Sequence, residues 1–268
     1  MPTAIQAPRS LSPAELDQYL ARGWRPLGQR IYTADFIQLE LGDIYSVVPT
    51  RLPLAGHRWR KSQRKLLRRN GELFTFTIGP ARIDPAKQRI NLLYLEEQPT
   101  KSTPDLAIHL EHEGRRIFNT LEINIFHGDQ LVAFSYFDQG ITSAYSKAGV
   151  YDPAYSRYSL GLYTMYLEIE WCLQQGLQYY YPGYISPDIP LFDYKLRMGD
   201  MEFWDLQAQD WKPYATFDPQ LHAPLAVLHQ RVNAVYEALR EAGVASRAYE
   251  YLFFEMRLMD NDGGNYLD

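Results

Sequence analysis

The sequence predicts an α/β fold in which a mixed central sheet is flanked by helices. Three neighbouring stretches carry this prediction. Residues 117–148 contain three runs of strand-forming residues separated by turn signals. Residues 156–175 place apolar side chains at helical spacing. Residues 177–181 form a short aromatic run that is typical of a buried strand.

The N-terminal part predicts one helix and one hairpin. Ser12, Pro13 and Glu15 form a capping box, in which Ser caps, Pro takes the first helical position and Glu reaches back. We expect this helix to end at Gly23. Residues 31–48 contain two alternating stretches separated by Leu-Gly-Asp at 41–43, which predicts a hairpin.

A strongly cationic helix is predicted next, over residues 62–70 with a stop at Gly71. An acidic chain of net charge −5 that concentrates cations in this way favours a basic patch for a polyanion. A solvated cationic helix is the alternative interpretation. The seven cations between residues 58 and 69 are Arg58, Arg60, Lys61, Arg64, Lys65, Arg68 and Arg69.

The remaining elements are predicted from the same signals. Residues 73–78 read as a strand, and Asp84 caps a helix that runs to Glu97. Residues 224–242 and 245–259 read as two further helices. We therefore expect an N-terminal α/β lobe with the basic helix (1–103), a core (104–220) and C-terminal helices packed on that core (221–268).

The central helix begins close to a candidate anion site. Ser156 is the predicted N-cap and Gly176 the predicted C-terminal stop. Gly161 lies in the first turn, where a missing side chain permits close approach to exposed N–H groups, and Arg157 lies beside it. A glycine that merely relieves packing is the alternative interpretation.

Composition excludes several classes of protein. Hydrophobic content of 46% and charged content of 22% are ordinary for a globular protein, and no apolar run is long enough to span a membrane. The single cysteine, Cys172, excludes an internal disulfide and is interpreted as a small buried side chain. With no secretion signal at the N-terminus, we expect a cytoplasmic protein, and we expect neither a metal nor a cofactor.

The stretch RYSLGLYTMYLEIEWCLQQGLQYYYPGY, residues 157–184, resembles the C-terminal signature of the aminoacyl-tRNA–protein transferases of the arginyl and leucyl types. In that family an SLG-x-Y segment leads into a helix and a Y-x-Y-x-GY strand. Residues 48–54 and 62–70 resemble two further family segments. The chain lacks the cysteine cluster that the family carries after the segment matched here by Gly23–Tyr32.

The resemblance implies a fold, a reaction and a set of site residues. The order of strands, one helix and a further strand is that of the Gcn5-related acyltransferase (GNAT) fold. The implied reaction moves an amino acid from aminoacyl-tRNA to the N-terminal amine of a protein. The implied enzyme is an arginyltransferase or a relative of the leucyl type. The resemblance places Arg64, Arg68 and Arg69 on tRNA phosphate, Arg157, Ser159 and Gly161 at the acyl-donor end, and Asp138, Tyr145, Tyr184 and Lys195 in the cleft.

The chemistry of acyl transfer suggests roles for two of these residues. An N-terminal amine has a pKa of about 7.7–8.0, so a weak base is enough to deprotonate it. Asp138, or a water that it orients, is the predicted base, and Tyr184 the predicted acid. A capping Asp and a packed Tyr are the structural alternatives. Tyr179 and Tyr181 are expected on one face of their strand, with Tyr180 on the other.

Two other functions remain open at this point. One is a GNAT enzyme that uses acetyl-CoA, although Arg157 to Gly161 does not have the spacing of a complete pyrophosphate loop. The other is a non-catalytic protein that binds tRNA or protein and retains the fold.

Overall fold

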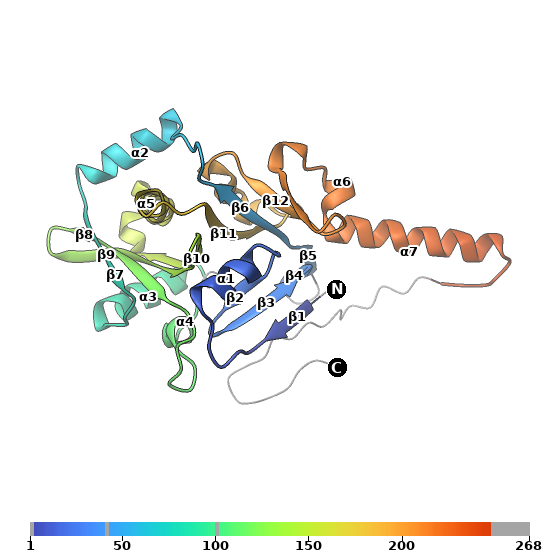
Figure 1. The fold of residues 1–268 in the computed structure, drawn as a ribbon, viewed down its shortest axis with the longest axis horizontal. Coiled ribbons are helices and arrows are strands. Elements are labelled where there is room, and N and C mark those ends of the chain that lie inside the picture. Colours follow the sequence, from blue (N-terminus) through green and yellow to red (C-terminus); the bar gives the residue numbers. More distant parts are fainter. Residues whose placement is uncertain (1–2, 41–42, 100–101, 248–268) are drawn as a thin grey trace.

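The computed structural model describes residues 3–40, 43–99 and 102–247, and its main feature is an eight-stranded sheet (Figure 1). Each neighbouring pair in this sheet is antiparallel except β10 and β11, which are parallel. Across the sheet the order is β13 (Asp210–Pro213), β12 (Glu202–Asp205), β6 (Val48–Pro53), β11 (Tyr179–Ile185), β10 (Ser143–Tyr151), β9 (Gln130–Gln139), β8 (Thr120–His127) and β7 (Thr75–Pro80).

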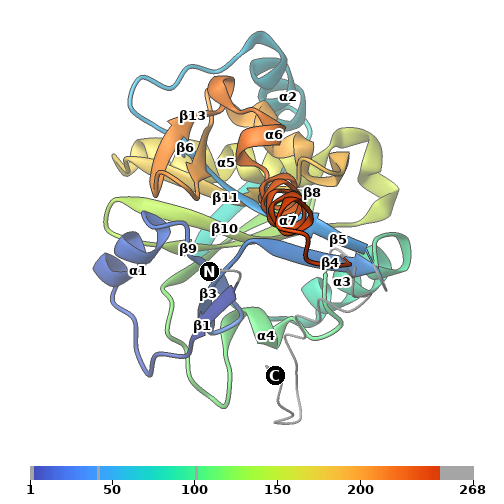
Figure 2. The ribbon, with the colours of Figure 1, turned by 90° about the vertical axis from the view of Figure 1, so that its right-hand side faces the viewer.

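The helix α5 (Leu160–Gln174) connects the two parallel strands and covers one face of the sheet. Its buried side chains pack with those of β8, β9 and β11, and α2 (Lys61–Gly71) lies beside it. Figure 2 shows α2 and α5 on one side of β10 and β11, and α1, α3 and α4 on the other. Three antiparallel strands, a crossover helix and a parallel strand confirm the predicted GNAT-type order and fold class.

The second face is covered by N-terminal elements and by two more helices. The helices are α1 (Pro13–Leu20), α3 (Pro85–Glu97) and α4 (Ala107–Leu110). A small sheet packs here in the order β1 (Thr3–Gln6), β3 (Arg30–Ala34) and β2 (Arg25–Leu27). Side chains from α1 and β3 bury Tyr145 and Tyr181 of the large sheet.

Several predicted boundaries are confirmed. Ser12 and Glu15 form the capping box of α1, and Asp84 caps α3. The hairpin predicted within residues 31–48 is formed by β4 (Phe36–Glu40) and β5 (Asp43–Ser46), and residues 41–42 between them lie outside the described residues. Gly176 follows α5 with a left-handed φ of 71°.

Other boundaries were wrong. Helix α1 ends at Leu20, and Gly23 follows in a left-handed turn. Ser156 does not cap α5, because Asp152 caps an earlier 3-10 helix, η1 (Pro153–Tyr158), by accepting a hydrogen bond from the N–H of Ala154. Helix α5 begins only after Ser159, whose φ is 55° and whose side chain makes no cap.

The predicted division at residue 103 does not separate two sheets. Strands β6 and β7 come from before this point, yet both lie in the large sheet beside strands from after it. No helix among the described residues is long and apolar enough to cross a membrane.

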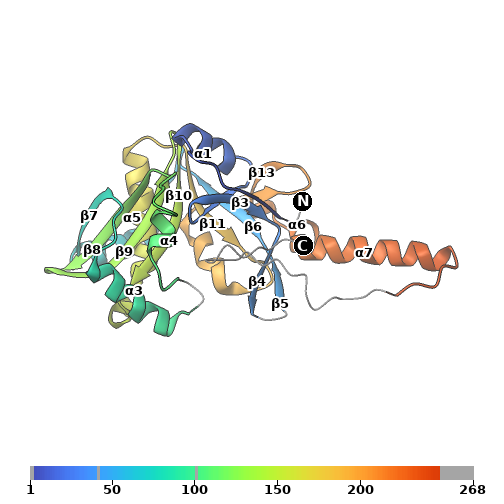
Figure 3. The same cartoon turned by 90° about the horizontal axis from the view of Figure 1, so that it is seen from below.

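The C-terminal part contains η2 (Pro190–Met198), η3 (Tyr214–Thr216), α6 (Pro219–His222) and α7 (Pro224–Glu241). Helix α7 projects from the body of the molecule (Figures 1 and 3), and Pro224 is its one fully buried residue. Its predicted packing on the core is therefore limited to its first turns. Of the second predicted helix, residues 245–247 are not helical and the rest lies outside the described residues.

Candidate active site

The two parallel strands separate after a short paired segment. Ser143–Tyr145 of β10 pairs with Tyr179–Tyr181 of β11, and neither strand pairs with the other beyond these residues. From there β10 remains on β9, with an irregularity at Lys147, while β11 remains on β6. We call the point of separation the splay. Beyond this point the backbone groups of β10 and β11 no longer bond to each other.

Three predicted cleft residues lie together at the splay: Tyr145, Tyr184 and Lys195. The Nζ atom of Lys195 donates a hydrogen bond of 2.8 Å to the carbonyl oxygen of Tyr184. Gly183 lies between them with a φ of 100°, and a Cβ added to it would lie 3.3 Å from the Lys195 Nζ and 3.8 Å from the Tyr145 Oη. Glycine is thus required by both its backbone and its neighbours. These four residues are the splay cluster.

Lys195 has unusual electrostatics for a lysine. It is 7% exposed, and its Nζ lies 4.8 Å from the ring centroid of Tyr184 and 4.9 Å from that of Phe192. Burial, with a smaller contribution from the positive charge of Arg25, lowers the pKa of Lys195 to about 7. A lysine with this pKa is partly neutral near pH 7 and can accept a proton.

In Tyr145 and Tyr184 the pKa is shifted in the opposite direction to that of Lys195. Burial raises the pKa of both Tyr145 and Tyr184 above the ordinary value for a phenol. Their hydroxyls therefore stay protonated at neutral pH and can donate hydrogen bonds to developing negative charge.

Arg25 borders the splay cluster and was not predicted. It lies on β2, and its guanidinium carbon is 4.8 Å from the ring centroid of Tyr32 and 5.1 Å from that of Tyr184. It is 2% exposed, and its three side-chain nitrogens have no hydrogen-bond partner among the described residues. The one sequence signal for it was its position inside the Gly23–Tyr32 segment that resembles the family pattern.

Asp138 lies outside the splay cluster, in a buried ion pair. Its carboxylate is 2.8 Å from the Nζ of Lys147 and accepts a 2.6 Å hydrogen bond from Thr120. Burial raises the pKa of Asp138 and lowers that of Lys147, while their attraction opposes both shifts. Asp138 is paired in register with Tyr145, so it supports the strand that carries this tyrosine. Its role as a base stays a prediction.

The predicted tRNA-contact residues form a second group, on the α2 and α5 side. Arg64, Arg68 and Arg69 are exposed on α2. Arg69 donates a 3.0 Å hydrogen bond to the carbonyl oxygen of Tyr158, and Arg157 donates a 2.7 Å bond to the hydroxyl of the same residue. The basic helix and the start of α5 thus meet around Tyr158.

Ser159 and Gly161 lie at this junction, and neither is tightly constrained there. Ser159 is exposed and makes no side-chain cap. A Cβ on Gly161 would lie 3.6 Å from the ring of Tyr151, which is an ordinary contact. Packing therefore does not explain this glycine, and the interpretation of an open helix N-terminus remains a prediction.

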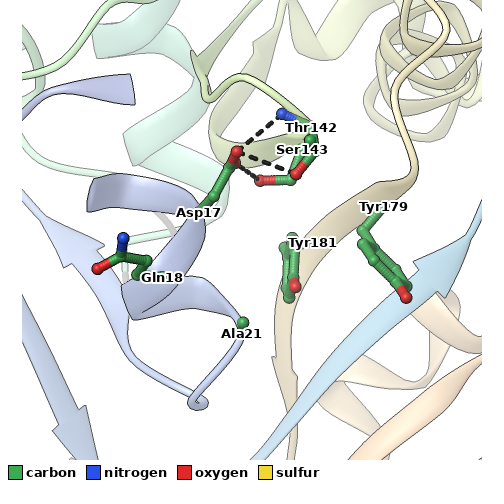
Figure 4. A pocket seen from close by; sticks show the side chains of 7 residues that line it. All are labelled: Asp17, Gln18, Ala21, Thr142, Ser143, Tyr179 and Tyr181. Carbon is green, nitrogen blue, oxygen red and sulfur yellow. Dashed lines mark hydrogen bonds between the residues drawn. The ribbon is translucent and has the colours of Figure 1, made fainter. Parts of the chain in front are cut away.

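A surface pocket of about 210 Å³ lies at the start of the β10–β11 pairing (Figure 4). Figure 4 shows Asp17 of α1 bonded to Thr142 and Ser143, with Tyr179 and Tyr181 opposite. The pocket confirms that these two tyrosines share one face. Tyr180 takes the other face, as predicted, where its hydroxyl donates a 2.7 Å hydrogen bond to Glu168. Because Tyr180 is fully buried, it cannot stack on a nucleotide base.

Two further buried groups complete the surroundings of α5. Burial raises the pKa of Glu168 to about 7, an effect that sequence inspection did not indicate. Cys172 is fully buried and its thiol pKa is raised well above the ordinary value, so the interpretation as a small buried side chain is confirmed.

Comparison with known proteins gives a consistent family. A family model described as arginine-tRNA-protein transferase, C terminus, matches residues 85–205, which include the splay cluster. An aspartate/glutamate leucyltransferase of Vibrio cholerae is 25% identical over 200 residues, 71% of this chain and 80% of that protein. One of Leptospira interrogans is 24% identical over 194 residues, 70% of this chain and 73% of that protein.

Similar solved structures share little sequence with this chain. FemX has a TM-score of 0.43 and 9% identity, over 69% of this chain and 64% of FemX. The C-terminal domain of a putative lysylphosphatidylglycerol synthetase from Agrobacterium fabrum has a TM-score of 0.42 and 11% identity, over 52% of this chain and 46% of that one. The family model and the curated relatives agree, and both support the aminoacyl-tRNA–protein transferase family for this chain.

Proposed function

We propose that this protein transfers an amino acid from aminoacyl-tRNA to the N-terminal amine of a protein, and that the reaction takes place at the splay cluster. The observation that carries the proposal is the convergence of Tyr145, Tyr184 and Lys195 on Gly183, within the segment that matches the family model. These residues supply a proton acceptor and neutral hydrogen-bond donors in a largely water-excluded place.

The reaction forms one bond and breaks one. The nitrogen of the acceptor amine attacks the ester carbonyl carbon of the aminoacyl-tRNA, an amide bond forms, and the bond from that carbon to the ribose oxygen breaks. One proton leaves the amine, and one proton is delivered to the departing ribose oxygen. No oxidant, reductant or further reactant is needed.

Lys195 is the residue best suited to accept the proton. With a pKa of about 7, its neutral amine is available near neutral pH. Tyr145 and Tyr184 keep their protons and donate to the developing oxyanion or to the ribose oxygen. Asp138 was the base predicted from the sequence. Its ion pair with Lys147 favours a positioning role instead, and Asp138→Asn tests this choice.

The exposed cations of α2 are proposed to hold tRNA phosphate, with Arg157 and Ser159 at the acyl-donor end. The support is their proximity: Arg69 and Arg157 both bond to Tyr158, next to the start of α5. Phosphate binding by such cations makes the affinity depend strongly on salt.

The names of the relatives suggest the two substrates. Because the curated relatives are called aspartate/glutamate leucyltransferases, we propose leucyl-tRNA as donor and an acidic N-terminal residue as acceptor. The arginyl transfer anticipated from the sequence is the competing possibility for the donor. Cytoplasmic location and the absence of a cofactor stay predictions.

A mass-spectrometric transfer assay tests this proposal. Peptides that begin with Asp, Asn, Glu, Gln or Lys are incubated with leucyl-tRNA, arginyl-tRNA, fully charged total tRNA or acetyl-CoA. We expect a leucyl mass gain on the acidic peptides only with charged tRNA, and loss of it in Lys195→Met but not in Lys212→Met. A peptide mass gain of one arginine would identify arginyl-tRNA as the donor. A mass gain of one acetyl group would identify an enzyme that uses acetyl-CoA.

Absence of any mass gain on every peptide, together with tight tRNA binding, would refute the catalytic proposal. It would favour the alternative of a non-catalytic protein that binds tRNA.

A further inference from the structure

Arg25 is a buried cation without a hydrogen-bond partner. It is 2% exposed, and none of its Nε and Nη atoms meets an acceptor among the residues that the structure describes. A guanidinium group carries five N–H donors and remains charged at any physiological pH. Leaving it buried and unpaired is strongly unfavourable, so such an arrangement indicates a place for an acceptor that the described part of the chain does not supply.

The surroundings of Arg25 define the shape of this place. Tyr32 and Tyr184 present their rings to the guanidinium group, with centroids at 4.8 Å and 5.1 Å from its carbon. Stacking of this kind fixes the plane of the group while its N–H edge stays available. The fork of N–H groups can then form two parallel hydrogen bonds with a planar carboxylate.

Other charges nearby are consistent with a ligand that carries both a carboxylate and an amine. Lys195 also lies over the Tyr184 ring, with its Nζ atom 4.8 Å from the ring centroid. Burial and the charge of Arg25 favour its neutral form, so it does not repel an incoming ammonium group as strongly as an ordinary lysine. The charge of Arg25 also lowers the pKa of the Asp35 carboxyl, against the larger effect of burial.

We propose that Arg25 is the specificity-determining residue for the acceptor, and that its guanidinium group binds the side-chain carboxylate of an acidic first residue. This inference rests on the proposed function. In Asp or Glu the side-chain carboxylate and the α-amine belong to the same residue. Binding the first at Arg25 therefore places the second within the splay cluster, close to Lys195 and Tyr145.

Phosphate of the tRNA is a less suitable occupant. The exposed cations of α2 lie on the opposite face of the sheet, where a polymer can reach them. Arg25 is a buried residue of the small N-terminal sheet and lies between two aromatic rings, which fits a single small carboxylate.

Binding of acceptor peptides in the absence of tRNA tests the inference directly. Fluorescence polarisation would compare labelled peptides that begin with Asp and with Asn, and then with Glu and with Gln, on the full-length protein. Since each pair differs only in a charged oxygen, we expect roughly ten- to hundredfold tighter binding of the acidic member. Equal affinity within both pairs on the wild-type protein would refute the role of Arg25.

Substitutions then assign the preference to one residue. Arg25→Gln should bind Asp and Asn peptides equally, and Arg25→Lys should retain part of the preference, because it keeps charge but loses the fork. Arg22→Gln, a neighbouring exposed arginine, is the matched control and should keep the full preference. Circular dichroism confirms folding of each variant, and an undiminished preference in folded Arg25→Gln would contradict the assignment.

The two proposals fail in different ways. Selective binding of acidic peptides without transfer from any charged tRNA would leave Arg25 as a carboxylate receptor and refute the transfer reaction. Transfer at equal rates to Asp and Asn peptides would support the reaction and refute the role of Arg25.

Discussion

Glu168 is an ionisable group enclosed between α5 and the central sheet. Its carboxyl group would ionise near pH 4.5 in the unfolded chain, but burial raises its pKa to about 7 in the folded protein. Between these two values the unfolded chain has lost the proton and the folded chain has kept it. The stability of the wild-type protein therefore falls as the pH rises from about 4.5 to 7.

Glu168→Gln cannot ionise, so it should escape this loss. We compare the free energy of unfolding of the variant with that of wild type. The variant's value minus the wild-type value should rise by about 2–3 kcal/mol from pH 5 to pH 8. Urea unfolding at both pH values measures this difference. Glu241→Gln on the exposed part of α7 is the control. A difference that does not change with pH would show that Glu168 is already ionised in the fold.

Cys172 offers a second test at the scale of a residue. Because its side chain is fully buried and its thiol pKa is raised, a thiol reagent should not label the native protein on the timescale of minutes. After unfolding in guanidinium chloride the same reagent should label the single cysteine completely. Rapid labelling of the native protein would mean that α5 opens readily.

Sequence reasoning could name single candidate residues only where a motif was involved. Tyr184 was predicted from the Tyr179–Tyr184 motif, and Tyr145 and Lys195 were predicted from the family resemblance around each of them. It missed Arg25, since nothing in the residue type separates a buried, unpaired guanidinium group from the many exposed ones. The partner of Asp138 was also beyond prediction, because Lys147 reaches it through an irregularity in β10.

At the scale of elements, one carboxylate joins α1 to the turn before β10. Asp17 accepts hydrogen bonds of 3.0 and 2.8 Å from the N–H groups of Ile141 and Thr142, and of 2.9 and 2.5 Å from the hydroxyls of Thr142 and Ser143. We expect Asp17→Ala to reduce the free energy of unfolding by about 2–4 kcal/mol. Gln18→Ala, one position away and exposed, is the matched control.

Gly140 provides a check on that contact. A Cβ on this residue would lie 2.0 Å from the Oδ1 of Asp17, so Gly140→Ala should displace α1. Its destabilisation should be smaller in the Asp17→Ala background than in wild type, which a double-mutant cycle measures. Additive effects of the two substitutions would show that α1 does not depend on this turn.

The exposed cations of α2 allow a prediction about tRNA. Replacing both Arg64 and Arg68 with Gln should weaken tRNA binding and reduce the slope of log affinity against log salt by about 1.5. The double variant Arg231→Gln, Arg240→Gln on α7 has the same net charge as the α2 double variant. It should change neither the tRNA affinity nor the slope of log affinity against log salt. Equal effects of the two double variants would indicate attraction by total charge instead of a defined surface.

Element boundaries were predictable where the capping chemistry was local. The caps of α1 and α3 were correct because each depends on residues three apart. The start of α5 was wrong because two candidate caps compete within a few residues. Asp152, followed by Pro153, formed a 3-10 turn first and moved the start of the helix to Leu160.

For the whole molecule, the sheet makes the central region depend on the N-terminal one. Strand β6 lies between β11 and β12, and Leu52 and Leu54 belong to the main core. We therefore expect the isolated fragment 104–220 to show no cooperative thermal unfolding. A chain that ends at Ala223 keeps every described strand and should unfold cooperatively. A cooperative transition of fragment 104–220 in calorimetry would instead support a domain boundary at residue 103.

The class of fold was predictable, but the position of β6 within the sheet was not. Periodicity and turn residues indicate which segments are strands, since both are local properties. Pairing of β6 with β11 and β12 joins segments far apart in the chain, and nothing local records such a contact. The same limit applies to the splay cluster and Arg25, which come from four separate elements.

The place of β6 also has a consequence for synthesis on the ribosome. This strand emerges early, whereas both of its neighbours are encoded in the last third of the chain. Until they emerge, its hydrogen-bonding edges and the side chains of Val48 and Leu52 have no native partners. Unpaired apolar strands of this kind are prone to associate with other chains. We expect stalled, incomplete chains of this protein to be strong clients of ribosome-bound chaperones.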